Sequence, residues 1–473
     1  MMNIRKSKIV CTIGPASGSR EMIHFLIKSG MDVARLNFSH GDHGFHRRMA
    51  GFIREESRKI NKPVAILQDL QGIKIRVGLV KGGSVELKKG SKVFLHAGHE
   101  ISSDKHIFIS YPALRKDVKT GDRILFDDGL IQAHVTGKTR DFLKAKIIEG
   151  GILKDKKGVN LPHTKTTLSS FTEKDRKDLE LGLRMDVDYV ALSFVRRADD
   201  VRIVREWLNK KRRSDLPLIA KIEKPEALDN IDEILDEVEG IMVARGDLGV
   251  EVFPEEVPVI QKTLINKANA KGKIVITATQ MLESMTEHSR PTRAEATDVA
   301  NAVIDGTDAL MLSAETTTGK YPLDAVRMMD KIIRYTESQF SHQPSAISHQ
   351  RSDFSGAVAE AACAASEDIG ARAIVAFTQS GFTARLVSKF RPKVPIIAFT
   401  PNRKVKRRMS LYWGVTPALI RHLSNTDEMI REVEKSLLDS RIAKGGDNIV
   451  ITAGSPLLKR GKTNLMKLHV IGE

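Results

Sequence analysis

The segment that most constrains the fold runs from Leu218 to Glu223, where two charged residues interrupt an apolar strand. Side chains of a strand point to opposite faces in turn, so Ile219, Lys221 and Glu223 are expected to share one face. Burying a cation and a carboxylate costs on the order of several kcal/mol per ion unless each finds a partner. One interpretation is a structural ion pair inside a barrel; the other is a functional site.

A second apolar segment, Gly240 to Ala244, ends in Arg245, Gly246 and Asp247. If the two strands are neighbours and parallel, Lys221, Glu223 and Asp247 converge at their carboxyl ends. Two carboxylates in such a place suit a hard divalent cation such as Mg²⁺, whose coordination is completed by water and substrate phosphate.

Apolar segments of this kind recur with helical segments between them, and we expect eight parallel strands joined by right-handed crossovers. The expected strands are Lys8–Ile13, Val33–Phe38, Val64–Asp69, Tyr189–Phe194, Leu218–Glu223, Gly240–Arg245, Lys273–Ala278 and Ala309–Ala314. Eight such units close a (β/α)₈ TIM barrel of the α/β class.

Between the third and fourth of these strands the pattern changes to short alternating segments with turns and no expected helix. These segments are Ser84–Leu87, Lys92–His96, His106–Ser110, Arg123–Phe126, Leu130–Val135 and Leu143–Ile148. They predict an inserted small β-barrel.

The last third of the chain has a new pattern after a polar stretch. We expect a separate α/β domain with a helix over Gly356–Asp368 and strands at Ala373–Thr378, Pro395–Thr400, Asn448–Ala453 and Leu465–Ile471. The predicted division is a barrel over residues 1–71 and 167–340, an inserted domain over 72–166, a linker over 341–353 and a C-terminal domain over 354–473.

Composition excludes several classes of protein. The net charge of +17 comes with only 5% aromatic residues, and Lys and Arg alternate with acidic residues along the chain, so we expect a solvated basic surface and no nucleic-acid partner. No segment approaches the ~18 apolar residues of a membrane span. Cys11 and Cys363 lie far apart and fit a reducing cytoplasm.

Polar residues follow seven of the eight expected strands. In chain order they are Arg35, Asn37 and Ser39; Asp69; Ser193; Lys221 and Glu223; Arg245, Gly246 and Asp247; Thr279 and Gln280; Ser313 and Glu315. One such residue is commonly a helix cap, but seven successive positions are not explained by capping. Cations and carboxylates without a Ser-His-Asp order favour phosphoryl transfer over acyl transfer.

These residues carry a resemblance to the pyruvate kinase family along nearly the whole chain. Besides Lys221-Ile222-Glu223, the matching segments are 34–41 (ARLNFSHG), 158–162 (GVNLP), 242–249 (MVARGDLG), 278–285 (ATQMLESM) and 290–302 (RPTRAEATDVANA). The chain departs from the family pattern at Ile73 in place of proline, and at His163 and Ala314 in place of glycine. None of the three removes a charged or metal-binding group.

The resemblance implies transfer of a phosphoryl group from phosphoenolpyruvate to ADP, the last step of glycolysis. It implies that Glu223 and Asp247 hold Mg²⁺, with Mn²⁺ as an alternative, and that Lys221 and Arg35 neutralise the phosphoryl group. The remaining site residues that it implies are Arg245, Gly246, Asp247, Thr279 and Gln280 for substrate and Ser313 for catalysis. Thr279 is also the candidate that relays the proton.

The resemblance also implies nucleotide binding under the inserted domain, which would close as a lid. The matching positions are Asn37, His40, Arg76, Lys157 and Asp128. From the residues alone, His40 could be an ordinary loop histidine and Asp128 part of a simple hairpin turn.

Many members of the family bind K⁺ at positions that match Asn37, Ser39, Asp69 and Leu70, next to a glutamate. Here that glutamate is replaced by Lys74, whose ammonium can stand where the ion would sit, and Gln71 and Val77 also resemble the K⁺-independent branch. We therefore expect no K⁺ requirement. The alternative is that Lys74 points to solvent.

The C-terminal domain is expected to be regulatory and to contribute to a homotetramer. A loop that opens a helix is a candidate cradle for a sugar-phosphate or nucleotide effector, or else a plain turn; it contains Thr378, Gln379, Ser380, Gly381, Phe382 and Thr383. Two other functions were weighed. An aldolase or mutase on the same barrel would not need the nucleotide residues, and a non-catalytic binding protein is expected to lose Lys221 or a metal ligand.

Overall fold

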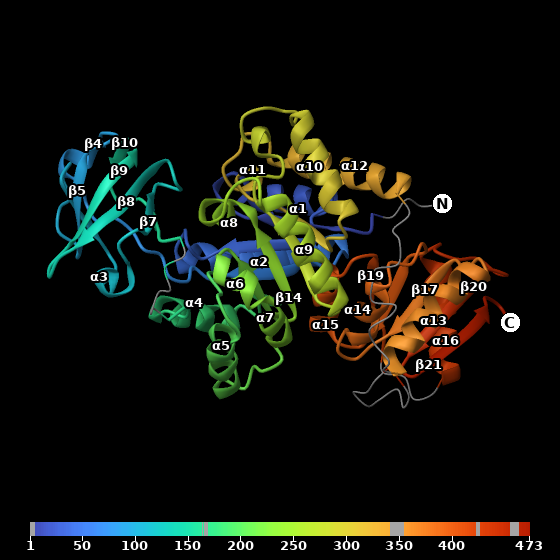
Figure 1. Cartoon of the computed structure of the whole chain (residues 1–473). Coiled ribbons are helices and arrows are strands. Elements are labelled where there is room, and N and C mark those ends of the chain that lie inside the picture. The colour runs from blue at the N-terminus through green and yellow to red at the C-terminus, as the bar shows by residue number, and fades with distance from the viewer. Residues whose placement is uncertain (1–4, 163, 165–168, 341–353, 422–425, 455–462) are drawn as a thin grey trace.

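The chain forms three parts in a row, with a barrel in the middle, a β domain at one end and an α/β domain at the other (Figure 1). The computed structural model describes residues 5–162, 164, 169–340, 354–421, 426–454 and 463–473. The expected linker over 341–353 and the departure at His163 lie outside these residues. The domain limits drawn from the sequence stay predictions.

Eight parallel strands close the barrel in the order β1-β16-β15-β14-β13-β12-β3-β2, as the sequence predicts. They are β1 (Lys8–Thr12), β2 (Val33–Asn37), β3 (Ala65–Asp69), β12 (Tyr189–Leu192), β13 (Leu218–Ile222), β14 (Gly240–Ala244), β15 (Ile274–Ala278) and β16 (Ala309–Leu312). Most predicted strands ran one or two residues too far at the carboxyl end. These last residues lie just beyond the strands, where the segments above the barrel begin, although the amides of Ile13 and Phe38 still donate to the neighbouring strand.

Helices cover the outside of the barrel. The longer ones are α1 (Arg20–Ser29), α2 (His43–Ile60), α4 (Glu173–Arg184), α5 (Ala198–Lys210), α9 (Val257–Ala270), α10 (Arg293–Ile304) and α12 (Pro322–Gln339). Shorter helices are α6 (Pro225–Asp229), α7 (Ile231–Glu237), α8 (Arg245–Glu251) and α11 (Ala314–Thr317). Within the described residues, no helix is both long and apolar enough to cross a membrane.

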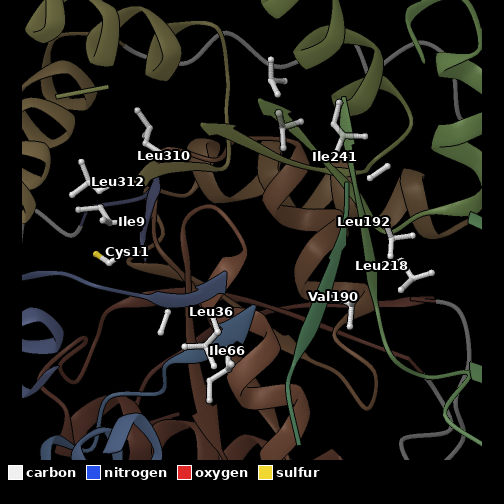
Figure 2. Packing of buried hydrophobic residues seen from close by; sticks show 14 of the residues in the cluster. Ile9, Cys11, Leu36, Ile66, Val190, Leu192, Leu218, Ile241, Leu310 and Leu312 are labelled. Carbon is white, nitrogen blue, oxygen red and sulfur yellow. The ribbon is translucent and has the colours of Figure 1, made fainter. Parts of the chain in front are cut away.

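The barrel strands supply two separate apolar layers. Leu218, Ala220 and Ile222 belong to the outer layer, which packs against the helices. Figure 2 shows residues of this layer from several strands. Ile219 belongs to the inner layer. The alternation predicted for Leu218–Glu223 is confirmed, because Ile219 and Lys221 point into the barrel while Ala220 between them points outward.

The inserted domain contains two sheets around one apolar core. The larger has the order β11-β7-β8-β9-β5-β6, and β10 pairs with β4. The strands are β4 (Ser84–Leu87), β5 (Lys92–Ala97), β6 (His106–Ile109), β7 (Arg123–Phe126), β8 (Ile131–Lys138), β9 (Leu143–Glu149), β10 (Gly151–Lys154) and β11 (Val159–Asn160). The expectation of no helix is wrong, since α3 (Leu114–Asp117) forms one turn. The segments β10 and β11 were not predicted, and the two residues of β11 are too few for an alternating pattern.

The C-terminal domain has one sheet of order β19-β18-β17-β20-β21, in which only β21 is antiparallel. Its strands are β17 (Ala373–Phe377), β18 (Ile396–Thr400), β19 (Val415–Leu419), β20 (Asn448–Ala453) and β21 (Leu465–Val470), and its helices are α13 (Phe354–Asp368), α14 (Phe382–Lys389), α15 (Arg403–Arg408) and α16 (Thr426–Asp439). The strand β19 was not predicted. It contains Pro417, which argues against a strand but is tolerated at this edge of the sheet.

The C-terminal domain seals the amino end of the barrel. The inner apolar layer of the barrel continues without a break into this domain as a single cluster. Around it, cations of α15 pair with barrel carboxylates: Arg407 Nε lies 2.8 Å from Asp188 Oδ1, and Arg408 Nη2 lies 3.0 Å from Asp215 Oδ2. Part of the high positive charge is therefore used to attach one domain to the other.

A fully buried charge cluster lies at the same boundary. Lys389 Nζ is 2.5 Å from Asp308 Oδ2 and 2.9 Å from Asn269 Oδ1, and Arg391 Nη2 is 2.9 Å from Asp308 Oδ1. The Asp308 and Lys389 side chains are each 1% exposed. Burial lowers the pKa of Lys389 to about 8 against the opposing effect of Asp308. One carboxylate thus balances two cations that have little access to water.

We expect Asp308→Ala to destabilise the protein by about 3–5 kcal/mol, because two buried cations lose the carboxylate that both of them contact. The control is Glu367→Ala, which breaks the exposed pair with Lys393 and should cost at most about 1 kcal/mol. Urea unfolding followed by circular dichroism gives the midpoints. Equal shifts for the two variants would contradict the assignment.

Candidate active site

The polar side chains gather where the inward-facing strand residues reach the carboxyl end of the barrel. Arg35 of β2, Asp69 of β3 and Lys221 of β13 occupy the inward face one step above apolar residues of the inner layer. All three are at most 8% exposed. The barrel therefore changes from an apolar interior to a charged mouth within about one residue of each strand.

Lys221 is the centre of this mouth. Its ammonium nitrogen lies 2.8 Å from Glu223 Oε1, 2.8 Å from Ser193 Oγ and 3.5 Å from Asp69 Oδ1. Asp69 in turn accepts a 2.7 Å hydrogen bond at Oδ2 from Arg35 Nε. Two cations and two carboxylates thus alternate in one connected network.

The network fixes the charge states of its members. Burial alone would lower the pKa of Lys221, but the charges of Asp69 and Glu223 outweigh it and raise that pKa. Burial would raise the pKa of Asp69, yet Lys221 and Arg35 hold it below its ordinary value. Lys221 is therefore a permanent cation at neutral pH.

Glu223 differs from its neighbours. Burial raises the pKa of Glu223 to about 7, Lys221 opposes this, and the negative charge of Asp247 adds to it. Glu223 and Asp247 are thus close enough to repel each other, and this repulsion would be relieved by a further cation.

The two carboxylates fit a hard divalent metal. Glu223 Oε2 accepts a 2.7 Å hydrogen bond from the Phe194 amide. The buried Oε1 forms the ion pair with Lys221 but accepts no aligned hydrogen bond from the described residues. Asp247 is exposed and forms no hydrogen bond or ion pair with the described part of the chain. The described residues contain no group of three or more His, Cys, Asp or Glu side chains that could hold a metal by themselves. A metal held by two carboxylates needs further oxygens from water or substrate, which is typical of Mg²⁺.

Thr279 closes the other side of the mouth in a strained conformation. Its φ is 70°, and that of Gln280 is 54°. A β-branched residue in the left-handed region is an outlier that persists only when its surroundings enforce it. Here its hydroxyl accepts a 2.7 Å hydrogen bond from the Gly246 amide. The predicted carboxylate cradle of Gly246 and Thr279 is thus brought together, although its binding role stays a prediction.

Arg245 holds the strained loop at Thr279 and Gln280 in place. Its Nη2 donates to Thr279 O at 2.7 Å, and its Nη1 lies 2.6 Å from Asp298 Oδ1. The guanidinium is therefore engaged with the loop rather than open to the mouth. Sequence reasoning gave Arg245 a direct substrate contact, a role that remains untested.

Ser313 and Glu315 stand beside this loop. Glu315 is fully buried and accepts hydrogen bonds from the amides of Ser313 (2.6 Å) and Leu282 (3.0 Å), so it ties two loops together. The Ser313 hydroxyl oxygen is buried and makes no hydrogen bond to the described residues. Among the described residues of these two loops, it is a buried polar atom left for a ligand or water.

The expected nucleotide residues lie on the facing edge of the inserted domain. Arg76 Nη1 donates to Lys156 O at 2.7 Å, and Lys157 Nζ is 2.8 Å from Asp127 Oδ1. Asp128 is exposed in a turn at φ 54°, as expected for the β7–β8 hairpin. Burial lowers the pKa of His40, and Lys74 and Arg76 lower it further, so these cations reach the barrel loop that carries His40.

Lys74 lies within electrostatic reach of both parts. Burial and the charge of Arg76 lower its pKa, while Asp247 of the barrel and Asp128 of the inserted domain oppose that change. The four positions that match a family K⁺ site lie at the ends of β2 and β3, where Asn37 and Asp69 are register partners. Asn37 Oδ1 accepts from the Ser39 amide, and Leu70 O accepts from Ser193 Oγ. Asp69 is already paired with two cations.

The proposed effector loop joins β17 to α14. Gly381 has φ 90°, and its amide donates to Thr378 Oγ1 at 2.8 Å. Ser380 is exposed, while the Thr383 hydroxyl lies 2.9 Å from that of Thr463. Gln379 and Phe382 complete the turn. Its amides are arranged as in many helix starts, so the geometry agrees with both interpretations.

Sequence reasoning missed two contacts of the mouth. Thr12 accepts a 3.0 Å hydrogen bond from Arg35 Nη1, and Ser193 was noted only as a polar strand end, although it binds Lys221. The alternation of β1 could have found Thr12, since it lies two residues after the inward-facing Val10.

Comparison with known proteins gives a consistent result over the whole chain. The pyruvate kinase barrel-domain family matches residues 4–326, and the pyruvate kinase alpha/beta-domain family matches residues 356–469. A pyruvate kinase of Geobacillus stearothermophilus is 47% identical over 474 residues, which cover 99% of this chain and 81% of the relative. One of Clostridium acetobutylicum is 42% identical over 472 residues, which cover 99% of this chain and 100% of the relative.

A solved structure agrees with the sequence matches. The crystal structure of a pyruvate kinase from Cryptosporidium parvum has a TM-score of 0.94 and 37% sequence identity, covering 99% of this chain and 96% of that chain. Sequence and fold therefore point to the same relatives.

Proposed function

The chain belongs to the pyruvate kinase family and is a phosphotransferase, and from this premise we propose that it transfers the phosphoryl group of phosphoenolpyruvate to ADP, giving pyruvate and ATP. The observation that carries the proposal is the network at the barrel mouth, where Lys221 is a permanent cation beside Glu223, and where the charges of Glu223 and Asp247 repel each other. Phosphoryl transfer depends mainly on positioning and on stabilising developing charge, and this site is built for both.

Arg35 and Lys221 bind the phosphoryl group in this proposal. Arg35 is oriented by Asp69 and Thr12, which engage Nε and Nη1 and leave Nη2 without a partner among the described residues. Ser193 and Glu223 fix the Lys221 ammonium at the barrel mouth. The bond between phosphorus and the enol oxygen breaks as a bond to the terminal phosphate oxygen of ADP forms.

Glu223 and Asp247 are the residues that would hold Mg²⁺ or Mn²⁺. When bound, the divalent ion supplies Lewis-acid stabilisation of the negative charge on the phosphoryl and enolate oxygens. The Gly246 and Asp247 amides, with the Thr279 hydroxyl, bind the substrate carboxylate, and Gln280 and Ser313 complete the pocket. The enolate then takes a proton at its methylene carbon through Thr279 and water.

The nucleotide binds between barrel and lid in this proposal. His40 and Asn37 contact it from the barrel, while Arg76, Lys157 and Asp128 contact it from the inserted domain. Closure of that domain excludes water, which would otherwise hydrolyse the donor. We place the enzyme in the cytoplasm as a homotetramer, with the C-terminal domain as the regulatory part.

A coupled assay that follows pyruvate formation tests the activity. Glu223→Gln and Asp247→Asn should each reduce turnover by about a hundredfold or more, because the metal loses one charged ligand. Glu233→Gln removes the same charge from an exposed position on α7 and serves as the control. Near-normal turnover in either site variant would refute the metal assignment.

We also propose that Lys74 replaces K⁺. Its electrostatic coupling to Asp247 and Lys221 supports a position near the site rather than in bulk solvent. A potassium ion about 4 Å from the ammonium would be repelled by about 4 kcal/mol at an effective dielectric constant of about 20. Asp69, which would bind the ion, is already paired with Arg35 and Lys221.

The test measures pyruvate formation with Mg²⁺ in a buffer whose only monovalent cation is tetramethylammonium. The wild type should be active there. Added K⁺ should change its rate by less than about tenfold, because K⁺ binding is weakened by more than ~1.4 kcal/mol. Lys74→Glu should create a K⁺ requirement, whereas Lys88→Glu, on an exposed turn of the lid, should not. Strong K⁺ activation of the wild type would disprove the idea.

The effector loop is a separate proposal. Its amides lead into α14 and its exposed Ser380 hydroxyl is available for a phosphate. If a sugar phosphate or nucleotide activates the enzyme, Ser380→Asp should abolish activation through charge repulsion and leave the basal rate unchanged. The basal rate without effector is the internal control, and persistent activation would place the effector elsewhere.

A further inference from the structure

The short helix α8 has a different task at each end. It begins with Arg245 and Asp247 at the barrel mouth and ends at Glu251. Glu251 follows Asp247 by four positions, so the two residues lie about 6 Å apart along the axis and on the same side of the helix. Any tilt of α8 at Glu251 is therefore transmitted to Asp247.

Glu251 is a buried carboxylate shared by the lid and the barrel. Its Oε1 accepts a 2.8 Å hydrogen bond from Asn160 Nδ2 and lies 2.5 Å from Lys224 Nζ. The Glu251 side chain is 1% exposed, and its Oε2 has no hydrogen-bond partner among the described residues. A buried carboxylate with so few partners depends strongly on each of them.

The two partners lead to different parts of the site. Asn160 belongs to β11, which pairs with β7 of the inserted domain through Asn160 and Leu125. Lys224 directly follows the metal-ligand candidate Glu223 on the loop after β13. Glu251 thus connects the lid, the loop of one carboxylate and the helix of the other.

Further contacts place the lid on the same turn of α8. The Arg123 guanidinium of β7 lies 5.0 Å from the centre of the Phe253 ring. A Cβ atom added at Gly129, in the β7–β8 hairpin, would meet Val250 at 3.7 Å. The lid therefore contacts residues 250–253, which form the C-terminal end of α8 and the first residues after it.

We propose that Glu251 is a positioning residue that couples the seating of the lid to the separation of the two metal carboxylates. It holds α8 against Asn160 and Lys224, so that Asp247 stays opposite Glu223 only while the lid is docked. Metal and nucleotide binding are then linked through one side chain that touches neither. This inference rests on the proposed function, in which Asp247 and Glu223 hold the metal and the lid covers the nucleotide.

The experiment compares Glu251→Ala, Glu251→Gln and Asn160→Ala with the wild type in the intact enzyme. In Glu251→Ala we expect the Mg²⁺ activation constant and the KM for ADP to rise together by about tenfold or more, since charge-assisted hydrogen bonds are lost. Glu251→Gln keeps an oxygen for Asn160 but loses the negative charge that faces Lys224, and should be intermediate. Glu255→Ala, on the exposed loop after α8, is the matched control and should change neither constant.

A readout without turnover separates this inference from the proposed function. Amide hydrogen exchange of residues 245–251 and 159–160 should accelerate in both Glu251→Ala and Asn160→Ala, and the Asn160 variant covers the case in which Glu251→Ala fails to fold. A wild type without activity would refute the proposed function, not this coupling. An active series with a lower Tm but unchanged Mg²⁺ and ADP constants would overturn the coupling.

Discussion

The structure depends on one requirement: charges that face into a closed barrel must neutralise one another. Lys221 meets Asp69 and Glu223, and Arg35 meets Asp69, so the buried charges at the mouth alternate in sign. Arg35, Asp69 and Lys221 come from three different strands, so the network forms only when the adjacent strands β2, β3, β12 and β13 are in register. The chemistry of the mouth and the register of this half of the barrel therefore rely on the same side chains, and the negative charge that remains unbalanced at Glu223 and Asp247 is what a divalent cation would neutralise.

The two ends of the barrel meet this requirement in opposite ways. At the carboxyl end the charges keep limited contact with solvent and lie below a domain that is attached through few contacts, such as Asn160 with Glu251. At the amino end, Asp308 and Lys389 are sealed beneath the C-terminal domain, and the apolar layer continues across the boundary. A loosely held cover suits ligand exchange, whereas a continuous core makes the floor a fixed part of the barrel.

The sequence determines the periodic parts of this arrangement and not the contacts between distant segments. The strand count and the inward direction of Ile219 and Lys221 follow from alternation alone, and the mouth residues follow from where each strand ends. The two residues of β11 are too few for a pattern, and Pro417 argues against the edge strand β19. The engagement of Arg245 with the Thr279 loop and of Glu251 with the lid could not be predicted, because both depend on side chains that only the tertiary structure brings together.

Thr279 illustrates what this closure permits. Its backbone lies in a region that glycine occupies at no steric cost, yet the position needs a hydroxyl to meet the Gly246 amide. Glycine there would relieve the backbone strain but would leave the Gly246 amide without this hydroxyl. Backbone stability and the hydrogen bonding of the loop therefore make opposite demands on one position, and a redesign that scores it by backbone conformation alone would remove the hydroxyl.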